Sequence, residues 1–209
     1  MTNLNASLTT GEETLTESAT SSRTAAAVGL LGSVMAASCV VLAGNGAGTG
    51  TGADITSTLL SSPTRFQLTA IIAVYAAAAL CVAAVRLGRR IGGDAGTLAT
   101  LAGVAVSVLM AGYYACFAAG VVVADYVLTE AGPGVGEAAL VVLNVVEITR
   151  YAPGLLLVAA VLVARRRLPR TITVPAAVLA ALTVFPMTSW VAAVLIPVWL
   201  GIAAVDPRR

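Results

Sequence analysis

The chain alternates between long runs of apolar residues and short polar segments. Each apolar run is bounded by glycine, proline or charged residues. A helix needs about 20 mostly apolar residues to cross the hydrocarbon core of a bilayer, which is about 30 Å thick. The runs have this length, and we predict spans at residues 24–43, 66–85, 97–124 and 138–164.

The final apolar stretch, residues 171–205, is compatible with one helix or with two. As one helix it would measure about 52 Å, well beyond the hydrocarbon core. Pro186 interrupts helical hydrogen bonding, and Ser189 is a suitable cap for a second helix. We therefore favour six spans, with the last two at 171–185 and 189–205. The alternative is a five-span bundle in which 171–205 is a single long tilted helix.

These runs predict an all-α integral membrane helical bundle. Every backbone polar group at membrane depth needs a partner, which a helix supplies within itself. A β-barrel would need alternating segments of roughly ten residues, and the continuous Ala, Val and Leu runs do not show that pattern. The composition agrees, with 58% hydrophobic and 11% charged residues. Soluble domains have about 45–50% and about 25%. The main expected partner is therefore the lipid bilayer.

The first 22 residues are rich in Ser, Thr and Glu and contain no apolar run. Such a segment cannot bury enough apolar surface to offset its chain entropy, so we expect a disordered tail at 1–22 and the bundle at 23–209. A cleaved signal peptide is disfavoured. Only Arg23 precedes the first apolar run, and that run is long enough to span a membrane.

The arginines indicate how the chain threads the membrane. Ten of the 12 basic residues, all of them arginines, lie at span ends that would face one side. They are Arg23, Arg86, Arg89, Arg90, Arg165, Arg166, Arg167, Arg170, Arg208 and Arg209. Short arginine-rich loops stay in the cytoplasm. We therefore predict a membrane protein with a cytoplasmic N-terminus.

Charge and chemistry exclude several classes of function. The arginines lie in short loops rather than along a groove, so no nucleic-acid partner is expected. The chain has no histidine, and hence no imidazole to bind haem, zinc or copper or to act as a base. Cys39, Cys81 and Cys116 lie at different depths without C-x-x-C spacing, as is typical of small buried residues. We expect no cofactor and no metal.

Small residues in the third run suggest close helix packing. Gly112, Cys116 and Gly120 repeat at four-residue spacing and form a stripe on one helix face. We interpret the stripe as a packing surface within the chain. The less favoured alternative is the seam of a homo-oligomer.

One group of polar residues stands out within the apolar runs. Asn144, Glu147 and Arg150 interrupt the fourth run, Tyr151 follows them, and Asp125 ends the third run. Glu147 and Arg150 are neighbours at helical spacing, and Asn144, Glu147 and Tyr151 share a face. An uncompensated charge near the bilayer centre costs about 2.5–3.5 kcal/mol, so a partner for Arg150 is expected, either Glu147 or Asp125. The alternative is an interfacial ion pair, with Arg150 extending to the lipid headgroups.

Aromatic residues lie near this group and at the proposed outer turn. Tyr113 and Tyr114 either line the same cavity or pack against lipid, and the second interpretation is favoured. Trp190 is expected at the membrane interface, where tryptophan is common.

Three short segments stand out beside the spans. They are Leu59-Leu60-Ser61-Ser62-Pro63-Thr64-Arg65-Phe66, Leu168-Pro169-Arg170 and Ile196-Pro197-Val198-Trp199. Together they resemble a small bacterial, actinobacterial-like family of multi-spanning membrane proteins of unknown function, with a similar layout over about residues 23–209. The resemblance implies a six-helix membrane protein and brings no catalytic residue with it. Combined with the arginine pattern, it predicts a bacterial plasma (inner) membrane location with the N-terminus in the cytoplasm.

Two functional hypotheses follow. The favoured one is a non-enzymatic structural or regulatory bundle that packs with itself or with an unidentified membrane partner. The alternative is a transporter of lipid or small molecules that uses the polar site in the fourth helix. An enzyme is disfavoured because the sequence offers no nucleophile–base pair and no acidic metal cluster.

Overall fold

The computed structural model describes residues 4–44, 52–127, 134–185 and 188–205, and they form an all-α bundle. These ranges contain helices and no strand, which confirms the predicted fold class. The helices are α1 (Leu4–Ala43), α2 (Gly52–Ser61), α3 (Pro63–Ile91), α4 (Gly93–Val127), α5 (Gly134–Val163), α6 (Arg170–Val184) and α7 (Ser189–Ala203).

Four helical segments are long and apolar enough to cross a membrane. They are Arg23–Ala43, Pro63–Ile91, Gly93–Val121 and Asn144–Val163. These segments agree with the first four predicted spans and are compatible with a membrane location. Because α6 and α7 have only 15 residues each, the total of six spans stays a prediction.

The last apolar stretch forms two helices, as the favoured prediction has it, and not one. Phe185 adopts an extended conformation (φ −89°, ψ 120°) and ends α6. The cap of α7 differs from the prediction, because Thr188 precedes the helix and Ser189 is its first residue. The Thr188 hydroxyl donates a hydrogen bond of 2.9 Å to the Leu182 carbonyl, which links the turn back to α6.

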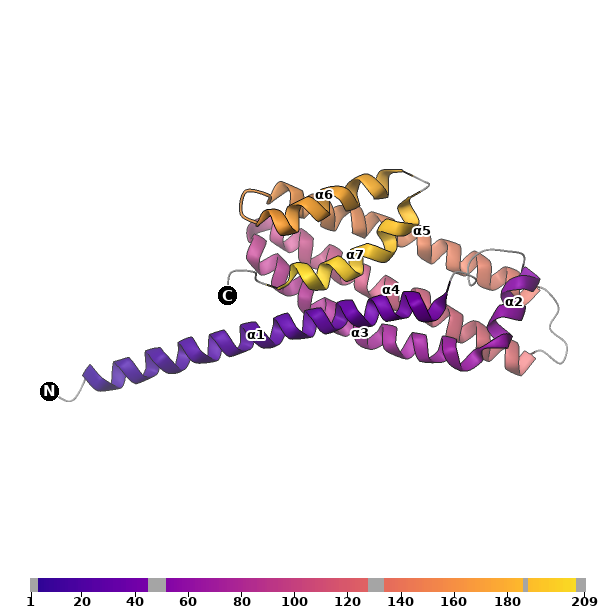
Figure 1. Cartoon of the computed structure of the whole chain (residues 1–209), viewed down its shortest axis with the longest axis horizontal. Coiled ribbons are helices and arrows are strands. Elements are labelled where there is room, and N and C mark those ends of the chain that lie inside the picture. Colours follow the sequence, from indigo (N-terminus) through magenta and orange to yellow (C-terminus); the bar gives the residue numbers. More distant parts are fainter. Residues whose placement is uncertain (1–3, 45–51, 128–133, 186–187, 206–209) are drawn as a thin grey trace.

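The N-terminal segment differs from the expected disordered tail. In the structure α1 begins at Leu4, and Figure 1 shows its first half extending away from the other helices. Beginning a helix is costly, whereas lengthening an existing helix costs little. The apolar second half of α1 supplies that existing helix, and no proline interrupts the sequence between Leu4 and Ala43.

Helix α2 lies between the first two predicted spans and belongs to neither of them. Leu59 is buried and packs against Gly120 of α4. A Cβ added at Gly120 would lie 3.1 Å from the Leu59 Cδ1 atom. Pro63 occupies the first turn of α3, where a proline is well tolerated. It separates α2 from α3 and lets α2 lie across one end of the bundle (Figure 1).

The turn from α3 to α4 is very short, because two glycines adopt positive φ angles. Gly92 has φ 70° and Gly93 has φ 60°, a region that only glycine occupies without cost. The Gly92 amide donates a hydrogen bond of 2.9 Å to the Gly88 carbonyl and closes α3. Both helices therefore extend beyond the predicted spans and meet almost directly.

Small residues bring the helices together, although not where the sequence stripe predicted. A Cβ on Gly201 of α7 would overlap the Gly29 carbonyl oxygen and the Ser33 hydroxyl of α1. Gly88 of α3 and Gly96 of α4 are in similarly close contact. In the predicted stripe Gly120 packs closely against α2 and Cys116 packs against the core, whereas Gly112 has open space beside it.

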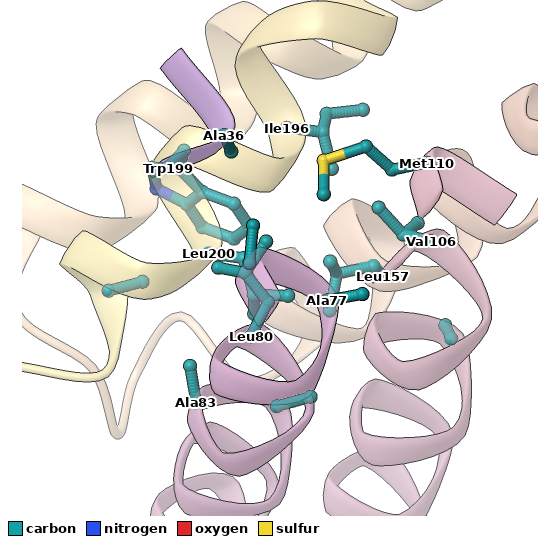
Figure 2. Packing of buried hydrophobic residues seen from close by; sticks show 14 of the residues in the cluster. Ala36, Ala77, Leu80, Ala83, Val106, Met110, Leu157, Ile196, Trp199 and Leu200 are labelled. Carbon is teal, nitrogen blue, oxygen red and sulfur yellow. The ribbon is translucent and has the colours of Figure 1, made fainter. Parts of the chain in front are cut away.

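A continuous apolar core joins these helices. Figure 2 shows side chains of α3, α4, α5 and α7 meeting in it, among them Leu80, Met110, Leu157 and Leu200. Alanine supplies many of the other buried positions. Because alanine side chains are short, the helix backbones can approach closely, which is the usual basis of packing in membranes.

Candidate functional site

Arg150 is the centre of the candidate site, and the structure buries it inside the bundle. Its side chain is 8% exposed, although it lies within the apolar segment Asn144–Val163 of α5. The guanidinium carbon is 4.5 Å from the centroid of the Tyr113 ring on α4. A cation over an aromatic face is attracted by the negative charge density of the ring. Arg150 therefore packs against α4.

Tyr113 belongs to a chain of aromatic rings that crosses from α4 to α3. Its ring is edge-on to that of Phe117, with centroids 5.2 Å apart, and Phe117 stacks on Phe66 at 5.7 Å. At the far end the Arg65 guanidinium carbon is 4.9 Å from the Phe66 centroid. The chain of contacts thus joins Arg150 to Arg65 across three helices.

Helix periodicity and one proline place these rings. Tyr113 and Phe117 are four residues apart on α4 and therefore share a face. Arg65 and Phe66 lie in the first turn of α3, which begins at Pro63. Phe66 is fully buried, so it fixes the register of α3 against α4.

The structure describes only part of the predicted site. Arg150 is buried, Tyr151 is half-buried, and Asn144 is exposed. The side chains of Asp125 and Glu147 lie outside the described part of the chain. The predicted pairing of Arg150 with either carboxylate is therefore untested.

The sequence interpretation missed the aromatic partner. Tyr114 is only 5% exposed, so the expectation that it packs against lipid is wrong, and Tyr113 contacts both Tyr114 and Arg150. The four-residue spacing of Tyr113 and Phe117 was a detectable signal of a shared face. The contact of that face with α5 was not detectable, because it depends on how two helices pack.

Three buried hydroxyl groups serve the backbone. Thr69 and Ser107 donate hydrogen bonds of 2.7 Å to the carbonyls of Arg65 and Gly103, one turn earlier in their own helices. Ser33 donates a bond of 2.6 Å to the Val198 carbonyl and so connects α1 to α7. These three residues and Arg150 are buried among the polar and charged residues whose side chains the structure describes.

The opposite end of the bundle carries a second set of arginine contacts. The Nη1 atom of Arg90 donates to the carbonyls of Ala203 and Val205, each at 3.2 Å. Arg167 donates from Nη1 to the Ile91 carbonyl at 3.1 Å. Beside it lies a cavity of about 250 Å³, lined in part by Asp94.

The described side chains do not assemble a metal site. No group of three or more His, Cys, Asp or Glu residues comes together among them. Cys39 is buried and Cys81 and Cys116 are half-buried, all as free thiols, which agrees with the expected role of small apolar residues. The arrangement around Arg150 can hold a cation against aromatic faces and can fix the mutual register of α3, α4 and α5.

Comparison of the chain with protein-family models, with curated proteins and with solved structures finds no match. The resemblance to a bacterial membrane family therefore stays a prediction from the sequence.

Proposed function

We propose that this chain is a multi-pass protein of the bacterial plasma membrane that works as a non-enzymatic structural or regulatory bundle. The proposal rests on the contacts of the buried polar side chains, which are made with other groups of the same chain. Ser33, Thr69 and Ser107 bond to backbone carbonyls, and Arg150 lies against an aromatic ring of the same chain. The buried polar chemistry that the structure describes therefore serves packing.

The orientation belongs to the same proposal. The C-terminal ends of α3 and α5, and the arginines that follow or end them, lie at one end of the bundle (Figure 1). Arginine-rich short loops stay in the cytoplasm during insertion. We propose that this end and the N-terminus face the cytoplasm, and that the partner is a second copy or another membrane protein.

Labelling with a membrane-impermeant maleimide on intact cells tests this topology. Ser61→Cys lies at the α2 end and Arg89→Cys at the arginine end, and both positions are exposed. We expect Ser61→Cys to react in intact cells and Arg89→Cys to react only after permeabilisation. The unsubstituted protein, with Cys39 buried, measures the background. Equal labelling of both variants in intact cells would contradict the proposal.

Transport is a second candidate, because Arg150 is a charged residue buried within an apolar segment. Such residues often line substrate or proton pathways. Purified protein in liposomes containing a pH-sensitive dye distinguishes the two. The packing role predicts that Arg150→Gln lowers stability and that neither protein moves protons. A proton flux in the wild type that Arg150→Gln abolishes would favour transport.

A further inference from the structure

The two short helices α6 and α7 enclose a groove that the functions above do not use. Its volume is about 660 Å³, within the range of about 300–1,000 Å³ that is usual for ligand sites. The lining is almost wholly apolar and includes Pro175, Val178, Leu182, Leu195, Trp199 and Ile202.

The length of the groove matches one leaflet of a bilayer. Its lining extends along α6 from Thr171 to Leu182, a rise of about 16 Å. Half of a hydrocarbon core is about 15 Å. At its rim Val178 and Ile202 are exposed, so in a membrane the groove would open directly onto acyl chains.

Positive charge lies at one end of the groove. Arg170 begins α6 beside Thr171 and is exposed. Across from it, Arg90 donates its hydrogen bonds to Ala203 and Val205, which both line the groove. Arginine is well suited to bind phosphate, and basic pockets between helices near the membrane surface bind anionic lipid headgroups.

Trp199 contributes an aromatic ring to the groove. In Figure 2 its six-membered ring points towards the core, and the nitrogen lies on the opposite edge. Because the indole nitrogen is buried, the aromatic body of Trp199 is the part that a lipid chain would contact.

We propose that the groove binds one anionic glycerophospholipid, with an acyl chain between α6 and α7 and its phosphate beside Arg170 and Arg90. This inference rests on the proposed membrane location. The lipid holds together two helices that are each shorter than a usual span, and it makes their packing dependent on the charge of the surrounding lipids.

The headgroup contact is tested with the full-length protein in nanodiscs of phosphatidylcholine containing a minor fraction of phosphatidylglycerol. Native mass spectrometry then measures which lipids stay bound to the protein after it is released from the nanodisc. A basic side chain near an anionic membrane surface is worth about fivefold in binding. We therefore expect Arg170→Gln to lower phosphatidylglycerol retention about fivefold, and the matched exposed variant Arg89→Gln to leave it unchanged. Equal retention by the two variants, or equal retention of both lipids by the wild type, would overturn the proposal.

The acyl contact is tested with two tryptophan variants of similar exposure. Val178 is 54% exposed and lies in the groove, whereas Val74 is 56% exposed on α3. We expect Val178→Trp to abolish retention of the lipid and Val74→Trp to keep it. The proposal is overturned if Val178→Trp retains lipid like the wild type, or if it converts a dimer to a monomer, which would make a second copy the occupant. If Val178→Trp fails to fold, the Arg170→Gln comparison decides.

The same experiment separates failure of this inference from failure of the proposed function. A wild-type protein that does not enter nanodiscs contradicts the membrane location and the lipid site together. A protein that enters nanodiscs and keeps the expected topology, but binds no phosphatidylglycerol in preference, contradicts the lipid site alone.

Discussion

Arginine is stabilised in different ways at the two ends of this bundle. At one end Arg90 and Arg167 donate hydrogen bonds to backbone carbonyls of Ala203, Val205 and Ile91. Towards the other end Arg65 and Arg150 lie over the rings of Phe66 and Tyr113.

The difference follows from where each arginine lies relative to helix ends. The last carbonyls of a helix have no partner within it and carry partial negative charge. Because α3 and α7 both end at the arginine-rich end, their carbonyls are available there. Arg150 lies inside α5, where most carbonyls already accept helical bonds, and Arg65 lies at the positive start of α3. Aromatic faces supply negative charge density beside both arginines.

The largest expected effect comes from separating α7 from α1, because this removes the carbonyls that Arg90 uses. In Gly201→Ala the new Cβ overlaps the Gly29 carbonyl oxygen and the Ser33 hydroxyl. We expect a loss of about 3 kcal/mol in the free energy of unfolding. Gly112→Ala is the control, since open space surrounds it and its higher helix propensity should keep or raise stability. The unfolding midpoints of both variants are measured by heating the protein in detergent and monitoring the reaction of buried Cys39 with a thiol-specific dye. Identical midpoints would show that the α1–α7 contact is not close.

Removing the carbonyl contacts directly should have the next largest effect. Arg90→Met loses two charged hydrogen bonds, each of a kind worth about 1.5–3 kcal/mol, and keeps most of the apolar side chain. We expect a net loss of about 2 kcal/mol in chemical unfolding in mixed micelles. Arg89→Met, an exposed neighbour, should change little. A loss of the same size in Arg89→Met would point to net charge as the cause.

Replacing the aromatic face should cost somewhat less. Tyr113→Leu removes the cation–π contact with Arg150 and the edge contact with Phe117, for an expected loss of about 1–2 kcal/mol. Tyr113→Phe keeps the ring and should retain most of that stability. A double-mutant cycle with Arg150→Gln isolates the pair. If the effects of Tyr113→Leu and Arg150→Gln simply add, the ring does not stabilise the arginine.

The exposed member of the aromatic chain should contribute least. Arg65 is exposed, and cation–π contacts at exposed sites are worth about 0.5–1 kcal/mol. Arg65→Gln should therefore shift the unfolding midpoint slightly and Arg65→Lys less still, in the same detergent assay at several salt concentrations. A larger loss than in Tyr113→Leu would reverse the ranking of exposed and buried contacts.

The candidate site was predictable only in part. Arg150 was visible in the sequence as a charge within an apolar run, and a partner was expected on electrostatic grounds. The search for that partner considered carboxylates, whereas the structure also places an aromatic ring of another helix against Arg150. The groove between α6 and α7 was not predicted at all, since its existence depends on how far apart two helices pack.

The sequence by itself determined the fold class, the four long spans and the break near Pro186. Run length against bilayer thickness and the loss of one backbone donor are local properties of the chain. Only the tertiary structure decided which glycines lie in the tight contacts, since Gly29 and Gly201 meet from opposite ends of the chain while Gly112 does not pack. It also decided that Arg150 lies on Tyr113. Contacts between helices depend on rotation and separation, and apolar runs with no periodic polar face leave both undetermined.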